Sequence, residues 1–399
     1  MISKGCVRPN FHRWSLQALA ESTKVSSSTS LFLLDCIVSR LEYQHDVIQD
    51  LLRWSSQEGD QKHAIRGLET LAYIHKDTCR LGKDLLEHQT IWKRSSTADR
   101  HLVHSTFLEI RARHANTVEA SVEVLGHWRE QLHQEQAGVG ETLASSPSQT
   151  EHLEQYILLH ESIEDFLRRR LGIQLLCDHH VELHERSRSI VTVDAPIQTY
   201  VEQAVTEARH IVDAHLHVHP DVTIYGQGAT GAVIRPWLHH SMVEILKNAM
   251  AAVVQQSKAT TTTSEAPLLP PIAIHIDQDD TGISIDVIDR GTGIEKEDHI
   301  LGLGHSSSGH NKRWDRLDEQ QSYAAVRSPL SSLGVGLKVA RYHVQHFGGR
   351  IDVVNNNDGG NGCTASIVLP TDESLLEEIP LHNWLSDQEA EPYKSTSAD

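Results

Sequence analysis

Three short segments follow one another in the second half of the chain, and their order constrains the fold more than any other feature. They are Glu244–Ala249, Asp289–Ile294 and Gly334–Leu337, and a polar stretch of about forty residues separates the last two. Together they offer a carboxylate and a carboxamide on a helix, a carboxylate at a turn, and glycines at a helix start. This combination predicts a nucleotide site, with a carboxylate for adenine, a carboxamide for Mg²⁺ and glycines for phosphates.

The first segment lies on a predicted helix. Apolar residues recur every three or four positions from Met242 to Val253, which is the spacing of one buried helix face. The neighbouring stripe carries Glu244, Lys247, Asn248 and Ala251. Asn248 has a neutral oxygen suited to Mg²⁺ that already holds phosphate and water oxygens. Lys247 supplies a point charge for a phosphate. Taken alone, this stripe could equally be an ordinary solvated helix face.

The second segment follows a predicted strand at residues 283–288, whose apolar side chains alternate onto one face. Asp289 ends this strand, and Gly291 and Gly293 allow the backbone to turn sharply and approach a ligand closely. A carboxylate at such a turn can accept a hydrogen bond from the exocyclic amine of adenine. The alternative is a plain turn at a strand end, where Asp and Gly are common.

The third segment opens a predicted helix that runs from Leu337 to Phe347. The first N–H groups of a helix are unpaired and its dipole is positive there, so this start predicts a phosphate site. Gly348 and Gly349 predict the end of the helix. Further strands are predicted at residues 351–354 and 364–369.

The two halves of the chain differ in their periodicity. Helical patterns occupy residues 30–135 and 151–185, and they include a long periodic segment from Val103 to Leu132; four main helices joined by loops suggest a bundle. Strand patterns appear only later, and the earliest are at residues 222–225 and 272–277. The composition shifts near residues 186–196, which predicts the domain boundary. Loops are predicted at residues 136–150 and 256–271.

The three segments resemble the N box and the two glycine boxes of the ATPase superfamily shared by gyrase, MutL and the histidine kinases. The helical half narrows the resemblance. Phe107–His114 is similar to the IRxRH helix of the mitochondrial pyruvate dehydrogenase kinases and branched-chain 2-oxoacid dehydrogenase kinases, and Phe166–Leu176 is similar to their FLxxxLxIRML helix. Tyr200–Asp221 resembles the helix that opens their nucleotide domain. Leu369–Asn383 resembles the C-terminus of the pyruvate dehydrogenase kinases. The similarity covers about residues 30–385.

The resemblance implies an α + α/β fold: an N-terminal four-helix bundle followed by a Bergerat-type ATP-binding α/β sandwich with a mixed sheet. We expect the bundle over residues 30–188, the nucleotide domain over residues 189–375 and a tail over residues 376–399.

Residues 1–29 resemble a mitochondrial transit peptide. Residues 1–20 contain no Asp or Glu but include Lys4, Arg8 and Arg13, and several serines follow. The alternative is an N-terminus that is merely disordered.

The resemblance also implies an activity, in which Mg-ATP phosphorylates a serine on the E1α subunit of the dehydrogenase and inhibits it. Glu244 matches the proposed general base. His240 lies one helical turn before it on the same face. In the pyruvate dehydrogenase kinases a histidine at this spacing tunes the glutamate, whereas the branched-chain enzyme lacks it. A chance histidine is the alternative, because the chain has 28 histidines and His239 is adjacent.

The same resemblance assigns the ligand contacts. Asn248 would bind Mg²⁺, Asp289 would bind adenine, and Thr364 matches a threonine near adenine. The remaining predicted contacts with ATP are Lys247, Ala251, Gly291, Gly293, Ser307, Ser308, Ser332, Leu333, Gly334, Val335, Gly336 and Leu337. The chain departs from the family pattern at two of the nearby positions: Ser332 replaces a glycine, and Lys338 replaces the usual proline.

Composition excludes several other classes of protein. The net charge of −18 argues against a nucleic-acid partner. Five scattered cysteines without a CxxC pair argue against zinc ribbons and a disulfide framework, and they suit a reducing compartment. There is no run of eighteen apolar residues, so we expect no membrane span. His180 and His184 are spaced to share a metal, but without a third ligand a structural role is favoured.

The partners implied by the resemblance are the E1α subunit, the lipoyl domain of the E2 core and a second copy of the chain, in the mitochondrial matrix. Pyruvate dehydrogenase is the favoured substrate because of His240 and the 369–383 segment, whereas His179–Glu185 favours the branched-chain enzyme. Two further functions are compatible with a nucleotide site in such a chain: a histidine autokinase, and a non-catalytic nucleotide-binding regulator of the complex.

Overall fold

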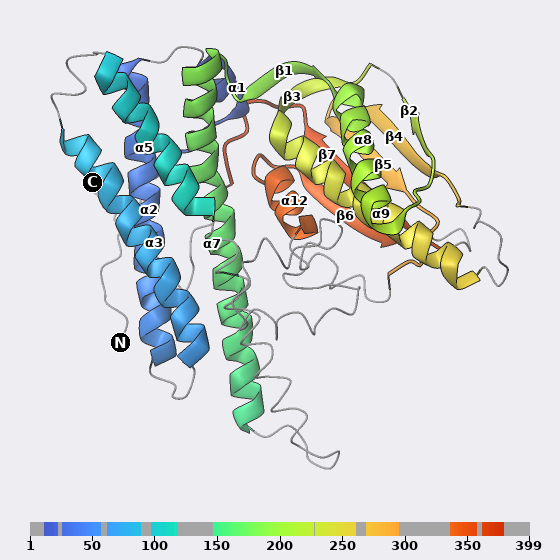
Figure 1. The fold of residues 1–399 in the computed structure, drawn as a ribbon, viewed down its shortest axis with the longest axis horizontal. Coiled ribbons are helices and arrows are strands. Elements are labelled where there is room, and N and C mark those ends of the chain that lie inside the picture. Colours follow the sequence, from blue (N-terminus) through green and yellow to red (C-terminus); the bar gives the residue numbers. More distant parts are fainter. Residues whose placement is uncertain are drawn as a thin grey trace, which may run out of the picture.

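The fold has a helical half and an α/β half, which lie beside one another in the computed structural model (Figure 1). The structure describes residues 12–22, 26–56, 62–88, 97–115, 117, 121, 147–226, 228–260, 269–294, 336–356 and 361–378. This arrangement confirms the predicted α + α/β class.

Within the described residues, four helices form the bundle that the sequence predicts. They are α2 (Ser27–Ser56), α3 (Lys62–Glu87), α5 (Thr97–Ala115) and α7 (Pro147–Arg186). α2 and α5 each contact both α3 and α7, so the four helices enclose one interior. That interior is filled by fully buried apolar side chains on all four helices, which removes a large apolar area from water.

One boundary in this half differs from the prediction. Residues 147–150, predicted as loop, already belong to α7. Pro147 begins the helix, where its missing N–H is of no consequence and its fixed φ suits the first turn. α5 is described as far as Ala115. Thr117 and Ser121 of the predicted continuation to Leu132 are helical, and its other residues lie outside the described residues.

A five-stranded mixed sheet forms the second half, in the order β2-β4-β5-β7-β6. Its strands are β2 (Val222–Tyr225), β4 (Ile272–Gln278), β5 (Gly282–Ile288), β6 (Arg350–Asn355) and β7 (Cys363–Pro370). β2 pairs with β4 in parallel, and the other neighbours are antiparallel. All five strands were predicted because their apolar residues alternate.

A second, two-stranded sheet was not predicted. β1 (Val191–Pro196) pairs with β3 (Thr230–Ile234). The register of this pair shifts between Thr192 and Ala195, and Asp194 adopts a left-handed φ of 49°. The irregularity interrupts the alternation by which a strand is recognised, so the sequence pattern is lost.

Three helices cover one face of the large sheet (Figure 1). They are α8 (Ile197–Leu216), α9 (Arg235–Thr260) and α12 (Gly336–Gln345). Their buried residues and those of the inner sheet face form one apolar cluster. α9 runs on through Thr260, so residues 256–260 are helical although we predicted a loop there.

The start of the chain is folded where we expected a transit peptide or a disordered segment. α1 (Leu16–Glu21) is capped by Ser15, whose hydroxyl accepts the N–H of Ala18. Trp14, Leu16 and Leu19 are buried. The prediction of disorder is therefore wrong for residues 12–22, because their apolar side chains join the bundle core. Residues 1–11 and 23–25 of the predicted transit segment lie outside the described residues.

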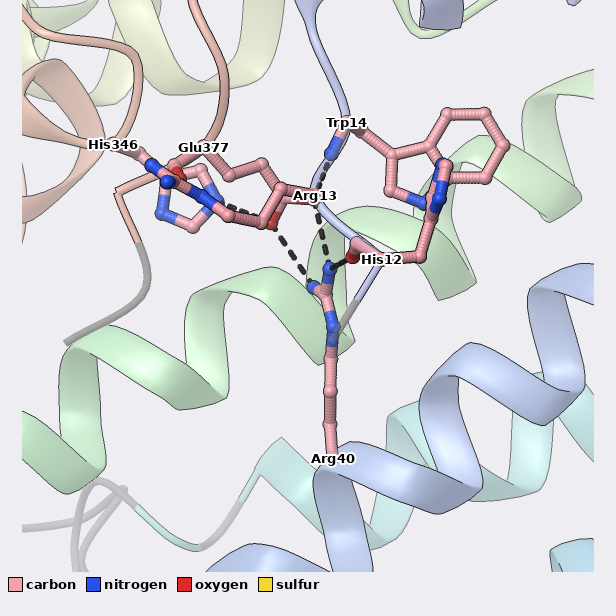
Figure 2. A network of polar contacts seen from close by, with 6 residues as sticks. All are labelled: His12, Arg13, Trp14, Arg40, His346 and Glu377. Carbon is pink, nitrogen blue, oxygen red and sulfur yellow. Dashed lines mark hydrogen bonds and ion pairs between the residues drawn. The ribbon is translucent and has the colours of Figure 1, made fainter. Parts of the chain in front are cut away.

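The predicted C-terminal tail also begins inside the fold. Glu377 is completely buried, and its carboxylate is the centre of a polar network (Figure 2). Arg40 donates two hydrogen bonds to it, at 3.0 Å to Oε2 and 2.8 Å to Oε1. The backbone N–H of Trp14 donates to Oε1 at 3.0 Å, and His346 Nε2 lies 3.1 Å from Oε2. This Glu377 network joins the N-terminal segment, α2, the residue just beyond α12 and the C-terminal segment.

Candidate nucleotide site

α9 presents the polar stripe that the sequence predicts. Its opposite, apolar side faces the sheet, because residues such as Leu246 and Met250 are fully buried. On the stripe, Lys247 Nζ lies 2.6 Å from Glu244 Oε1, and both side chains are almost completely buried. Asn248 is exposed. The stripe therefore combines an oriented carboxylate with an amide that a ligand can reach.

Asp289 lies where the sequence predicts, directly after β5. Its side chain is 5% exposed, and its Oδ1 accepts the N–H of Gly291 at 2.8 Å and the N–H of Cys363 at 3.3 Å. Burial raises the pKa of the Asp289 carboxyl, and these two backbone bonds act against that rise. Both bonds use Oδ1, so Oδ2 is the oxygen that can accept an adenine amine.

The turn after Asp289 is pressed against α9. A Cβ on Gly291 would lie 2.6 Å from the Cβ of Ala252, so only glycine allows this contact. Gly293 has a left-handed φ of 74°. This contact places Asp289, the candidate adenine-binding residue, beside α9, the helix that carries Asn248. The sequence prediction of one shared site requires these two residues to be close.

Two asparagines that sequence reasoning missed hold this turn. Asn355 Oδ1 accepts the N–H of Ile294 and Asn355 Nδ2 donates to its carbonyl, both at 2.8 Å. Asn356 Nδ2 donates to the carbonyl of Asp289 at 2.9 Å, and its Oδ1 accepts the hydroxyl of Thr364 at 2.7 Å. Thr364 is thereby linked to the Asp289 turn. The run of asparagines at the end of β6 was the available signal, but it falls between the strands predicted at residues 351–354 and 364–369 and was assigned no role.

The third segment is described only in part. Gly336 and Leu337 begin α12, close to the predicted helix start. Ser307, Ser308, Ser332, Leu333, Gly334 and Val335 lie outside the described residues, so their contacts with phosphate stay predictions. α12 packs on α9, where the hydroxyl of Ser241 lies 3.4 Å from the carbonyl of Ala340.

Lys338, at the position where the family usually has proline, is buried near the start of α12. It forms an ion pair with Glu164 of α7 and lies 5.4 Å from the centre of the Tyr342 ring. Burial lowers the pKa of the Lys338 ammonium, while the hydrogen bond with Glu164 acts in the opposite direction. This residue therefore ties the start of α12 to the bundle.

The described parts of the three segments thus meet around α9. The donor set is a reachable amide, a buried carboxylate with one oxygen to offer, and the start of a helix. These groups suit an adenine nucleotide with Mg²⁺.

Other sites are not indicated in the described part of the chain. There, no three or more His, Cys, Asp and Glu side chains are grouped so that they could hold a metal ion. The rings of His180 and His184 are 6.1 Å apart. Cys36, Cys79, Cys177 and Cys363 are buried thiols. None of the described helices is long and apolar enough to cross a membrane.

Two family models match the chain, one in each half. The model described as "Mitochondrial branched-chain alpha-ketoacid dehydrogenase kinase" matches residues 46–212. The model described as "Histidine kinase-, DNA gyrase B-, and HSP90-like ATPase" matches residues 234–373. The two models and the curated relatives together support the family of the mitochondrial 2-oxoacid dehydrogenase kinases. The matches contain the Phe107–His114 and Phe166–Leu176 helices and the three boxes on which the sequence resemblance rested, so that prediction is confirmed.

Relatives within this kinase family are distant. The mitochondrial pyruvate dehydrogenase kinase of Arabidopsis thaliana is 26% identical over 231 residues, covering 56% of this chain and 60% of that protein. Pyruvate dehydrogenase kinase isozyme 1 of Rattus norvegicus is 21% identical over 238 residues, covering 55% of this chain and 51% of that protein. The isozyme 1 of Homo sapiens is 22% identical over 241 residues, with the same coverage. The chain thus spans between half and three fifths of the length of these curated relatives.

Proposed function

We propose that the chain is a protein-serine kinase that uses Mg-ATP to phosphorylate the E1α subunit of a mitochondrial 2-oxoacid dehydrogenase complex, inhibiting it. One observation carries the proposal: the Asp289 turn packs against the helix that carries Glu244 and Asn248, in a chain whose bundle also matches the dehydrogenase kinases. The wider ATPase superfamily shares the nucleotide boxes but not this bundle.

The described residues define how the nucleotide would be held. Asp289 would accept the adenine amine through Oδ2, and Asn248 would contribute a neutral oxygen to Mg²⁺. The start of α12 would face the phosphates with the positive end of its helix dipole. When bound, Mg-ATP supplies the phosphoryl group that is transferred.

Glu244 would accept the proton of the substrate serine. Its carboxylate is held at 2.6 Å by the Lys247 ammonium, which restricts its rotation, and His240 lies one turn earlier on α9. A positioned carboxylate of this kind lowers the barrier to attack by the serine hydroxyl, because the proton leaves as the new bond forms.

Pyruvate dehydrogenase is the favoured substrate because His240 is present and the matched relatives are named pyruvate dehydrogenase kinases. The branched-chain enzyme is the second candidate, because the model that matches the helical half is that of the branched-chain kinase. We further propose the lipoyl domain of the E2 core and a second copy of the chain as partners, in the mitochondrial matrix.

The test is incubation of the purified full chain with Mg²⁺ and ATP labelled on the γ-phosphate, with each purified E1 in turn. Acid-stable label on an E1α serine supports the proposal, and the preferred E1 identifies the substrate. Acid-labile label on the chain itself would indicate a histidine autokinase. No transfer at all, with ATP still bound, would indicate a regulator. Asn248→Ala serves as the inactive variant, and Gln255→Ala, an exposed change two turns further along α9, is its matched control.

A further inference from the structure

A stack of aromatic rings lies between α9 and the chain at and just beyond α12, next to the candidate base. The ring of His343 lies edge-on to that of His240, with 5.3 Å between centroids. On another side it stacks on the ring of Trp237, at 4.8 Å and an interplanar angle of 16°. Trp237 in turn meets His346 edge-on at 5.2 Å. His240 therefore sits at one end of a continuous stack.

The other end of this stack is anchored by the Glu377 network. His346 Nε2 lies 3.1 Å from Glu377 Oε2, and Arg40 of α2 binds the same carboxylate (Figure 2). Because Arg40, His346 and Glu377 are all buried, their side chains cannot exchange these partners for water. The rings are thus held from the bundle side as well as from α9.

His343 contacts Trp237 and His240 through its ring. Within the described residues its buried Nδ1 has no hydrogen-bond partner, which is unfavourable for a polar atom away from water. A phenylalanine of the same shape would avoid this loss. The imidazole is neutral, because burial lowers its pKa well below the usual value, and the nearby His240, His346 and Arg170 act in the same direction.

We propose that His343 is a positioning residue: its ring holds the imidazole of His240 in one orientation, one helical turn before Glu244. The proposal rests on the proposed kinase function, in which His240 assists Glu244. A side chain free to choose among rotamers would spend part of its time away from the base. α12 also begins at the predicted phosphate segment, so the same helix would align His240 with the nucleotide.

Three variants test this role in the full chain. His343→Ala removes the ring, and we expect kcat to fall about tenfold, with the KM for ATP nearly unchanged, since misplaced catalytic groups lower the rate more than ground-state binding. His343→Phe retains a ring on Trp237 and should restore kcat to within about threefold of wild type. Val344→Ala is the matched control, because Val344 is buried on the same helix but belongs to the sheet-side core.

A spectroscopic readout separates this proposal from the kinase assignment. The imidazole C–H signals of His240, assigned with a His240→Gln variant, should shift in His343→Ala through the lost ring current and stay in place in Val344→Ala. If wild type transfers no phosphate, the proposed function fails, while the His240 signals still decide whether His343 holds that ring. Unmoved signals in His343→Ala overturn the proposal. So does a His343→Phe variant as slow as His343→Ala, or a Val344→Ala variant with the same loss of kcat.

Discussion

Glu377→Gln keeps the shape of the side chain at the centre of the Glu377 network and removes its charge. Burial by itself would raise the pKa of this carboxyl, but Arg40 and the hydrogen bond from His346 outweigh it and lower the pKa to about 2. The carboxylate is therefore charged throughout the neutral range. The glutamine variant would leave the Arg40 guanidinium, 3% exposed, without its counter-ion.

The size of the expected stability loss follows from the lowered pKa of Glu377. The difference between the ordinary value of 4.5 and about 2 corresponds to about 3 kcal/mol of folding free energy, at about 1.4 kcal/mol per pKa unit. Removing one partner of a buried ion pair is typically destabilising by about 3–5 kcal/mol, which is the same range. We expect Glu377→Gln to lose about 3 kcal/mol of unfolding free energy at pH 7.

Urea unfolding of the full chain measures this loss, and the adjacent residue supplies the control. Glu378 is half exposed, and its carboxylate lies 3.4 Å from Arg168, so Glu378→Gln should cost less than about 1 kcal/mol. The pH dependence gives a second check. A depressed carboxyl pKa stabilises the fold above the unfolded value, so the advantage of wild type over Glu377→Gln should shrink as pH falls from 4.5 toward about 2.

Two results would refute this reasoning. One is a Glu377→Gln variant as stable at pH 7 as Glu378→Gln. The other is an advantage of wild type that does not change with pH across that window. Arg40→Met combined with Glu377→Gln should recover part of the loss, because the uncompensated charge is then removed as well.

Four further outcomes are expected. Asn248→Ala should abolish transfer of label to E1, since a Mg²⁺ ligand is lost, and near-wild-type turnover would contradict the site. Asp289→Ala should raise the ATP dissociation constant measured by calorimetry about ten- to a hundredfold, and an unchanged constant would place adenine elsewhere. Glu244→Gln should lower kcat about 10²–10⁴-fold with ATP binding retained; retained turnover would exclude it as the base. Burial lowers the pKa of His75 and His180 to about 3, so the unfolded chain binds more protons below pH 6.5. Unfolding free energy should therefore fall from pH 6.5 toward 3 by up to about 1.4 kcal/mol per pH unit for each histidine, and the loss should be smaller in His75→Phe.

Periodic segments were recognisable without any knowledge of their neighbours. The five strands of the large sheet alternate apolar and polar residues because one face is buried against α8, α9 and α12. The bundle helices and α9 show helical spacing for the same reason. The three nucleotide segments were also recognisable, because each needs particular residue types within a few positions, as at Asp289, Gly291 and Gly293.

Features that depend on distant partners left no such local pattern. Trp14 and Glu377 are 363 residues apart in the chain, and neither looks unusual among its own neighbours. The contact between Trp14 and Glu377 makes the N-terminal segment and the start of the predicted tail parts of the folded core. Asn355 and Asn356 were missed for a similar reason, because an asparagine in an ordinary turn and an asparagine that holds the Asp289 turn look alike until the partner is known.

Local chemistry therefore settled the bundle helices, the five strands of the large sheet and the residue types of the candidate nucleotide site, since periodicity and turn geometry act over a few residues. Tertiary packing decided how the termini close the fold, how Lys338 ties α12 to the bundle, and which rings surround His240. These contacts are stable because they are buried: removed from water, an ion pair or a stacked ring has no alternative partner, and that condition exists only once the whole chain has folded.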